Sequence, residues 1–171
     1  MSKPPDLTHT DDEGRVRMVD VGGKPTTQRR AVARGVIRTT EAVVNLVISG
    51  TAPKGDVLAT ARIAGIQGAK RTSEWIPLCH PVGLDSTSID IRCSPENDIT
   101  TASGSGPGFE VTAEVTATGT TGVEMEALTA VSATLLSLYD MLKAADRGME
   151  LGGIHLLVKE GGRSGHWKRQ D

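Results

Sequence analysis

Apolar residues recur at steps of three and four along residues 124–146, the spacing of one face of an α-helix. This stripe consists of Leu128, Val131, Leu135, Leu138 and Leu142. Thr121 and Glu124 have the spacing of a capping box, which predicts where the helix begins. We therefore predict one long helix over residues 124–146.

The opposite face of this predicted helix carries few charges and mostly small side chains. It is made of Glu126, Thr129, Ala133, Ser137, Asp140 and Lys143. Such a face is suited to packing against a neighbouring subunit or lining a cavity. Glu126 and Asp140 lie fourteen residues apart, about 21 Å along a helix, so they cannot act on one reacting atom from a single chain. They therefore serve either the two ends of one long ligand or two separate sites. A pocket at a subunit boundary would use both ends of the helix.

The remaining pattern alternates between strands and helices. Helices are predicted at 40–48, with Thr40 as the cap and Gly50 at the end, and from Asp56 through Ala69. Strands are predicted at 17–21, 31–39, 86–92, 109–117 and 154–158. Residues 94–108 are rich in Gly, Ser, Pro, Asn and Asp and are predicted to form a loop. The pattern favours an α+β fold with helices packed on an antiparallel sheet.

The composition of the 171-residue chain indicates one domain with a core poor in large rings, since only 2% of its residues are aromatic. A small core gains burial between subunits, which favours an oligomer. We expect residues 1–6 to be a loose lead-in, 7–167 a single catalytic domain and 168–171 a tail.

Charge and cysteine content exclude several functional classes. With 19 basic and 21 acidic side chains the net charge is −2, so no overall field attracts nucleic acid. Two cysteines do not make a disulfide framework, and no stretch has the length and apolarity of a membrane span. We therefore expect a reduced cytoplasmic protein without nucleic-acid or membrane partners.

Several charged residues are candidates for chemistry, each with a plainer alternative. Asp140 and Lys143 are either a solvated helix pair or, if partly buried, a carboxylate beside an ammonium that can exchange protons. Lys54 precedes a predicted helix N-terminus, where anions bind, although a lone turn lysine commonly serves solubility. Lys70 belongs to a spaced group of cations that either binds a polyphosphate or is a solvated face.

Metal and cysteine chemistry are weaker candidates. Cys79 and His80 are adjacent on an extended segment bracketed by prolines, so their side chains are expected to point to opposite sides. The other histidines show no metal-binding spacing. The 161–165 run, GGRSG, is too short for a P-loop; it either wraps a phosphate with backbone amides or is a flexible tail. We expect no metal site.

Four segments of the chain are distinctive: LTHTDDEGRVRMVDVG (7–22), KGDVLATARIAGIQGAKRTSEWIPLCHP (54–81), GVEMEALTAVSATLLSLYDMLKA (122–144) and GGRSGH (161–166). They resemble the MoaC family of cyclic pyranopterin monophosphate synthases. The resemblance implies a ferredoxin-like α+β domain. It also implies a homohexamer, a trimer of dimers, with active sites at subunit interfaces.

The resemblance also implies a reaction and its residues. The family converts 3′,8-cyclo-7,8-dihydroguanosine triphosphate into cyclic pyranopterin monophosphate and releases pyrophosphate, without a cofactor. By position, Asp140 matches the proposed catalytic acid/base, and Lys143 and Lys54 match the essential lysines. The matching substrate-binding stretches supply Leu78, Cys79, His80, Met125 and Glu126, and Lys70 lies in another strongly matching segment.

Two positions depart from the family pattern. Thr120 stands where many members have lysine, and Arg163 replaces a usual lysine. Both changes bear on affinity more than on reaction type. Two rival functions remain open. One is a catalytically silent relative that binds a nucleotide, and the other is a metal- or cysteine-dependent nucleotide hydrolase.

Overall fold

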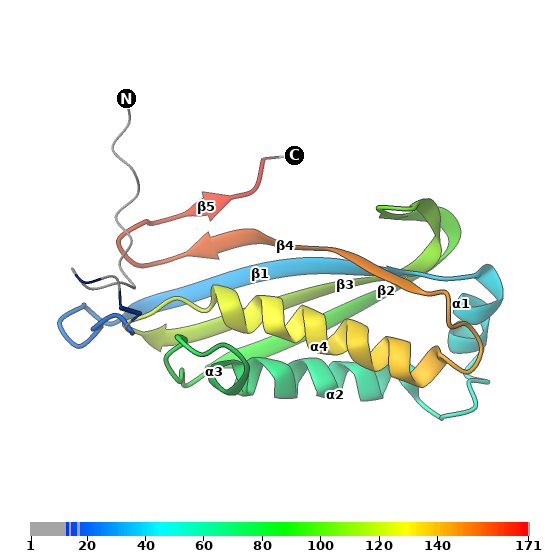
Figure 1. The fold of residues 1–171 in the computed structure, drawn as a ribbon, viewed down its shortest axis with the longest axis horizontal. Helices are drawn as coiled ribbons and strands as arrows, with labels where there is room; N and C mark the ends of the chain where they lie inside the picture. The colour runs from blue at the N-terminus through cyan, green and yellow to red at the C-terminus, as the bar shows by residue number, and fades with distance from the viewer. Residues whose placement is uncertain (1–12, 14, 17, 171) are drawn as a thin grey trace.

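The structure, a computed structural model, describes residues 13, 15, 16 and 18–170. Strands and helices alternate as the sequence pattern predicts (Figure 1). In chain order they are β1 (Thr27–Arg38), α1 (Glu41–Ile48), α2 (Val57–Lys70), α3 (Thr72–Trp75), β2 (Ser86–Thr101), β3 (Gly104–Gly119), α4 (Glu124–Leu142), β4 (Glu150–Glu160) and β5 (Trp167–Lys168). The α+β fold class is confirmed.

The sheet has the strand order β2-β3-β1-β4-β5, and every neighbouring pair is antiparallel. Between β1 and β4 the chain follows a β-α-β-β-α-β succession, with the longer helices α2 and α4 in the two crossovers. This order and succession are those of the ferredoxin-like fold. In Figure 1 the long strands and α4 lie roughly along the long axis of the molecule.

β1 shows how alternation divides the two faces of the sheet. Ala31, Ala33 and Ile37 are fully buried on the face that carries the helices. The alternate side chains of β1 lie on the other face, where arginines pair with glutamates of neighbouring strands. These pairs are Arg30–Glu114, Arg30–Glu160, Arg34–Glu110 and Arg38–Glu150. One face of the sheet therefore makes the core and the other a half-exposed ion-pair network.

α2 and α4 lie side by side on the core face because glycines of α2 allow close approach (Figure 1). Gly68 faces Ala133 and Thr129, and Gly65 faces Thr134. Thr129 and Ala133, in the middle of the small face of α4, therefore pack against α2 of the same chain. Our expectation that this whole face meets a neighbouring subunit or a cavity was wrong for this stretch, since sequence periodicity does not identify the partner of a face.

Replacing Gly65 by alanine is expected to destabilise the protein by about 1–3 kcal/mol through overpacking. A Cβ atom there would overlap the hydroxyl oxygen of Thr134, which is fully buried and donates a 2.8 Å hydrogen bond to the carbonyl of Ala130. Thermal or urea unfolding measures the effect. Gly83→Ala is the matched control because a Cβ there meets nothing within 4 Å. An unchanged or raised unfolding midpoint in Gly65→Ala would contradict the packing described here.

Both predicted caps of the first two helices are confirmed. The Thr40 hydroxyl accepts a 3.4 Å hydrogen bond from the Val43 amide, and the Asp56 carboxylate accepts one of 2.9 Å from the Ala59 amide. The predicted capping box of α4 is wrong: its N-cap is Val123, without a side-chain cap bond. That helix also ends at Leu142 rather than at residue 146.

Two further predictions fail. The predicted loop at 94–108 is instead the tip of the β2–β3 hairpin, because backbone pairing continues to Thr101 and Gly104 after a register shift between Ser94 and Ile99. The polar, glycine-rich composition suggested a loop, but this pairing holds the segment as a hairpin. The Thr101 hydroxyl also donates a hydrogen bond to Glu150 and accepts one from Arg38. Of the predicted strand at 17–21, residue 17 lies outside the described residues and 18–21 form no strand. The expected lead-in at 1–6 also lies outside them.

Candidate functional site

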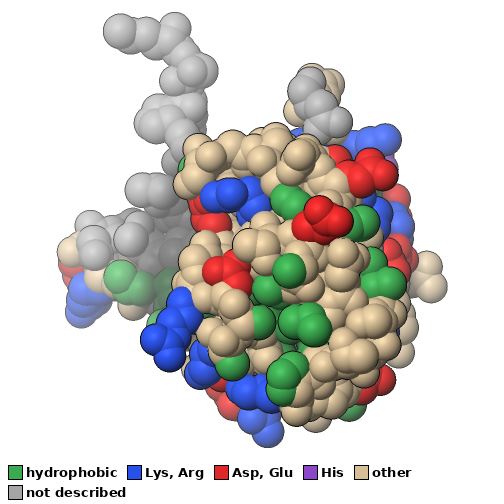
Figure 2. Space-filling view, turned by 90° about the vertical axis from the view of Figure 1, so that its right-hand side faces the viewer, with side chains coloured by type: hydrophobic (Ala, Val, Ile, Leu, Met, Phe, Trp, Pro, Cys, Tyr) green, Lys and Arg blue, Asp and Glu red, His purple; other side chains and the backbone are tan. Residues whose placement is uncertain are grey.

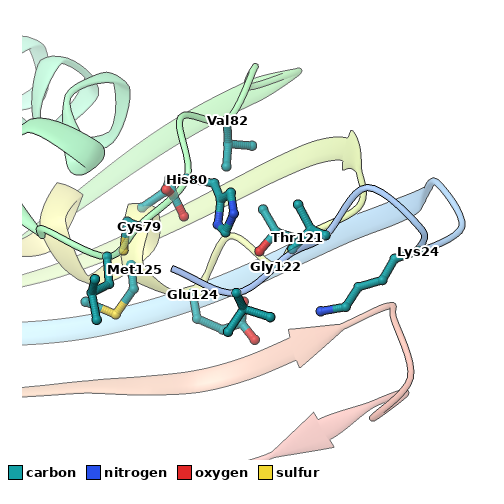
Figure 3. Close-up of a pocket in the computed structure, with 12 residues that line it drawn as sticks. Lys24, Cys79, His80, Val82, Thr121, Gly122, Glu124 and Met125 are labelled. Atoms are coloured by element: carbon teal, nitrogen blue, oxygen red, sulfur yellow. The ribbon is translucent and has the colours of Figure 1, made fainter. Parts of the chain in front are cut away.

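A pocket of about 450 Å³ lies at the N-terminal end of α4 (Figure 3). It is lined by Val19, Val21, Lys24, Leu78, Cys79, His80, Val82, Thr121, Gly122, Glu124, Met125 and Glu126. The structure therefore brings together the two substrate-binding stretches that the resemblance implies. A rigid segment between Pro77 and Pro81 supplies one wall, and the first turn of α4 supplies the other.

Burial sets the protonation behaviour of this pocket. The Glu126 side chain is only 4% exposed, and this burial, with a smaller contribution from the charge of Glu124, raises the pKa of its carboxyl. Burial also raises the pKa of the Cys79 thiol, and the negative charge of Glu126 raises it further. Cys79 is therefore held as a thiol rather than as a nucleophilic thiolate.

A second cluster lies near the C-terminal end of α4. The Lys143 ammonium is 2.7 Å from one carboxylate oxygen of Asp140, and the Lys54 ammonium is 3.2 Å from the other. Lys54 also donates a 2.8 Å hydrogen bond to the Asp140 backbone carbonyl. This end of the molecule, which also carries α1, faces the viewer in Figure 2, where acidic and basic side chains surround apolar ones.

The two lysines control the charge of Asp140. Hydrogen bonds from Lys143 and then Lys54 lower the pKa of its carboxyl below the ordinary 3.8. Asp140 is therefore ionised at neutral pH, and the ion pairs weaken only as the pH falls through that lowered pKa. All three side chains are between 41% and 59% exposed, so the cluster is open to a ligand or to another copy of the chain.

A further pocket of about 420 Å³ lies beside the first and shares Lys24, Thr121, Gly122 and Glu124 with it. Its other lining residues are Pro25, Thr27, Arg29, Thr120, Lys159, Glu160, Gly161, Gly162, Arg163 and Ser164. The glycine-rich run at 161–165 therefore forms part of a cavity wall. Both positions that depart from the family pattern, Thr120 and Arg163, also line this pocket.

The chain is similar to known proteins over most of its length. The sequence profile of the MoaC family matches residues 18–162. A protein of Novosphingobium aromaticivorans is 53% identical over 163 residues, 95% of this chain and 97% of the relative. The chain belongs to the MoaC family. That relative is named cyclic pyranopterin monophosphate synthase, as are proteins of Chloroflexus aggregans and Thermomicrobium roseum.

These two further relatives match the MoaC-family chain over nearly the same extent. The Chloroflexus aggregans protein is 51% identical over 96% of this chain and 94% of its own length. The Thermomicrobium roseum protein is 51% identical over 97% of this chain and 95% of its own length. The resemblance read from the sequence segments is thereby confirmed at the level of the family.

Within this MoaC-family chain the predicted residues form two groups rather than one site. Lys54, Asp140 and Lys143 are gathered near one end of α4, and none of them lines the pocket at its other end. Lys70, at the last residue of α2, lines neither of the two neighbouring pockets. The sequence prediction missed Lys24, which lines both. It lies in an irregular glycine-containing segment, and only its position within the resembling family could have indicated it.

No group of three or more His, Cys, Asp or Glu side chains suitable for a metal ion is found among the described residues of this MoaC-family chain. Cys79 and His80 both line the pocket, although we expected them to point to opposite sides. The segment before them is not fully extended, since the Cys79 amide donates a 3.0 Å hydrogen bond to the Ile76 carbonyl in a turn. Across the same described part, no helix is long and apolar enough to cross a membrane.

Glu126→Gln is expected to accelerate alkylation of Cys79 at mildly alkaline pH. Removing the negative charge lowers the pKa of the thiol, so a larger fraction is present as the reactive thiolate. Iodoacetamide labelling followed by peptide mass spectrometry measures Cys79 separately from Cys93, which is the internal control because burial raises its pKa without any part played by Glu126. Equal acceleration at both cysteines would indicate unfolding, and no change at Cys79 would contradict the coupling.

Proposed function

We propose that this chain is a lyase of molybdenum-cofactor biosynthesis. It converts 3′,8-cyclo-7,8-dihydroguanosine triphosphate into cyclic pyranopterin monophosphate and releases pyrophosphate. The observation that carries the proposal is that two separate segments of the chain line one pocket. Two segments more than forty residues apart, Leu78 to His80 and Met125 to Glu126, line one pocket in a chain 53% identical to a protein named for this synthesis.

The pocket at the start of α4 is suited to the heterocyclic part of this substrate. Val19, Val82 and Met125 offer apolar surface for a ring. The Glu126 carboxyl, with its raised pKa, and the His80 imidazole offer polar groups for the ring edge. As a carboxylate Glu126 accepts hydrogen bonds, and when protonated it also donates one.

The Lys54 cluster supports the proton transfers that the rearrangement needs. The ammonium groups of Lys54 and Lys143 are proton donors, held in place by the ionised carboxylate of Asp140. Loss of a proton from either lysine leaves an amine base beside the other cation. The same cations neutralise charge that develops on the phosphates. In this arrangement Asp140 acts by orienting both lysines as well as by exchanging protons.

The active site is proposed to form between two copies of the chain. The start of α4 and Asp140 are separated by most of the 19-residue helix, which is about 28 Å long, so one chain does not bring both groups to one substrate. A partner subunit that supplies its Lys54 cluster to this pocket resolves the separation. Ile63, Trp75 and Leu136 are each at least half exposed, which supports assembly, and we propose a homohexamer built as a trimer of dimers.

The decisive experiment supplies enzymatically generated cyclic dihydro-GTP intermediate to the purified protein. Mass spectrometry follows cyclic pyranopterin monophosphate, and a coupled assay follows pyrophosphate. We expect both products to appear together, with and without a chelator. Binding without either product would identify a silent relative. Turnover abolished by chelation or thiol blocking would instead favour a metal- or cysteine-dependent enzyme.

A further inference from the structure

Thr39 is a buried threonine at the junction between β1 and α1. The residue is 8% exposed, and its amide donates a 2.9 Å hydrogen bond to the Pro107 carbonyl of β3. Its hydroxyl donates a 2.7 Å hydrogen bond to one carboxylate oxygen of Asp146, 107 positions further along the chain. The end of the first strand is therefore tied by a side chain to the turn that follows α4.

Asp146 organises this turn. Its second carboxylate oxygen accepts a 2.7 Å hydrogen bond from the Gly148 amide, and its own amide donates one of 3.2 Å to the Leu142 carbonyl at the last residue of α4. The hydroxyl of Tyr139, one helical turn earlier, donates a 3.2 Å hydrogen bond to a carbonyl of the same turn. Both carboxylate oxygens of Asp146 are thus engaged by uncharged donors, and the turn is held from the helix and from β1.

Lys143 lies between two acidic residues, each three positions away. Its ammonium is 2.7 Å from a carboxylate oxygen of Asp140. Asp146, on the other side of Lys143 in the sequence, is engaged instead by Thr39 and Gly148. A carboxylate released from Thr39 would attract the nearby ammonium and compete with Asp140 for it. The bond from Thr39 therefore favours the pairing of Lys143 with Asp140.

Lys54 also depends on the junction at Thr39. The eight-residue helix α1 begins directly after Thr39 and Thr40 and leads into the turn that carries Lys54. The Lys54 ammonium reaches the end of α4, where it donates a 2.8 Å hydrogen bond to the Asp140 carbonyl. In Figure 1, α1 and the end of α4 lie at the same end of the molecule. The Thr39–Asp146 bond therefore joins the two segments that supply the Lys54 cluster.

We propose that Thr39 and Asp146 are positioning residues whose hydrogen bond fixes the end of α4 against the start of α1, so that Lys54 and Lys143 keep their separate contacts with Asp140. Neither positioning residue lines the two neighbouring pockets, so both act through the cluster. The consequence for catalysis rests on the proposed function, in which the cluster transfers protons. Small displacements of such groups are costly, up to about 10²-fold in rate for 1 Å.

Thr39→Val removes the hydroxyl and keeps the shape of the side chain. With the cyclic dihydro-GTP intermediate as substrate, we expect kcat to fall about tenfold and KM to stay within about twofold. Thr39→Ser, which retains a hydroxyl, should restore the rate. Thr134→Val is the matched control because it also removes a buried threonine hydroxyl, one that donates 2.8 Å to the Ala130 carbonyl inside α4. An unchanged kcat in Thr39→Val, or an equal loss in Thr134→Val, would overturn the inference.

A second measurement needs no turnover. Hydrogen bonds from Lys143 and Lys54 hold the pKa of the Asp140 carboxyl below its ordinary 3.8. If Thr39 maintains these contacts, the pKa of Asp140 should rise toward 3.8 in Thr39→Val and stay at the wild-type value in Thr134→Val. Nuclear magnetic resonance titration of the carbon-13-labelled aspartate carboxyls measures it. An unchanged pKa of Asp140 in Thr39→Val would overturn the inference whatever the rate.

If Thr39→Val does not fold, Asp146 decides. Asp146→Ala removes the same bond from its other side and should lower kcat and raise the pKa of Asp140 in the same way. Asp146→Asn can still bond with Thr39 and Gly148, so its kcat should stay within about twofold of the wild type. Wild-type behaviour of Asp146→Ala would overturn the inference.

Failure of this inference is distinct from failure of the proposed function. A wild type without turnover removes the reaction, while the titration of Asp140 still decides whether Thr39 and Asp146 position the cluster. Normal turnover in the wild type, with kcat and the pKa of Asp140 unchanged in Thr39→Val and Asp146→Ala, removes only the positioning role.

Discussion

Lys54→Met is expected to abolish formation of cyclic pyranopterin monophosphate, with a loss of at least about 10²-fold in kcat. The substitution removes the ammonium group that lies 3.2 Å from the Asp140 carboxylate and donates to the Asp140 carbonyl. Because Lys54 is 41% exposed, the fold should tolerate the change. Single-turnover assays with the cyclic dihydro-GTP intermediate measure the rate, and far-UV circular dichroism confirms folding.

Asp140→Asn extends this prediction and separates two roles of the carboxylate. Asparagine keeps the shape but loses the charge that holds both Lys54 and Lys143. If Asp140 mainly orients the lysines, the pH profile of the remaining activity should change along with its rate, since both ammonium groups lose the carboxylate that lies beside them. Lys168→Met is the control: it removes a lysine of β5 that lines neither pocket. Near-normal rates in Lys54→Met would remove this cluster from the mechanism.

Mixing two inactive variants is expected to restore activity. Lys54→Met impairs one half of the proposed site, and Glu126→Gln impairs the half at the other end of α4. If each site combines these halves from two chains, random reassembly of equal amounts gives about a quarter of the sites both halves intact. Activity should therefore recover to about a quarter of the wild-type value after the chains are dissociated and reassembled together.

The matched control for this experiment mixes Lys54→Met with Asp140→Asn. Both changes fall in the same cluster, so every mixed site carries one of them and no recovery is expected. Recovery in this control as well would show that the two residues belong to different halves. No recovery in the first mixture, with mixed oligomers demonstrated by mass spectrometry, would contradict a site shared between subunits.

Much of the fold follows from local patterns in the sequence. The three- and four-residue steps of Leu128, Val131 and Leu135 predicted α4. The caps Thr40 and Asp56 located the starts of α1 and α2. These predictions succeeded because each rests on interactions within one turn of helix. The hairpin tip at 94–108 was mistaken for a loop because its polar, glycine-rich composition hides backbone pairing that resumes after a register shift between Ser94 and Ile99.

The candidate site also combines a contact between neighbours in the sequence, which was predicted, with contacts between distant residues, which were not. Lys143 and Asp140 were paired correctly because i and i+3 meet on any helix. The contact of Lys54 with Asp140 joins residues 86 positions apart, and the spacing along the chain gives no information about it. Lys24 and Arg29 were not singled out for the same reason, since each lines a pocket whose other wall is the distant glycine-rich run.

The sequence by itself determined the α+β class, most helix starts, the chemical types of the candidate residues and the resemblance to the MoaC family. The tertiary structure decided which of them meet. It packed α4 on α2 through Gly65 and Gly68, and it buried Arg29 at a pocket beside the glycines of the 161–162 turn. The physical reason is that periodicity and capping report interactions between residues close along the chain. Burial and charge pairing depend instead on which distant segments the sheet brings together.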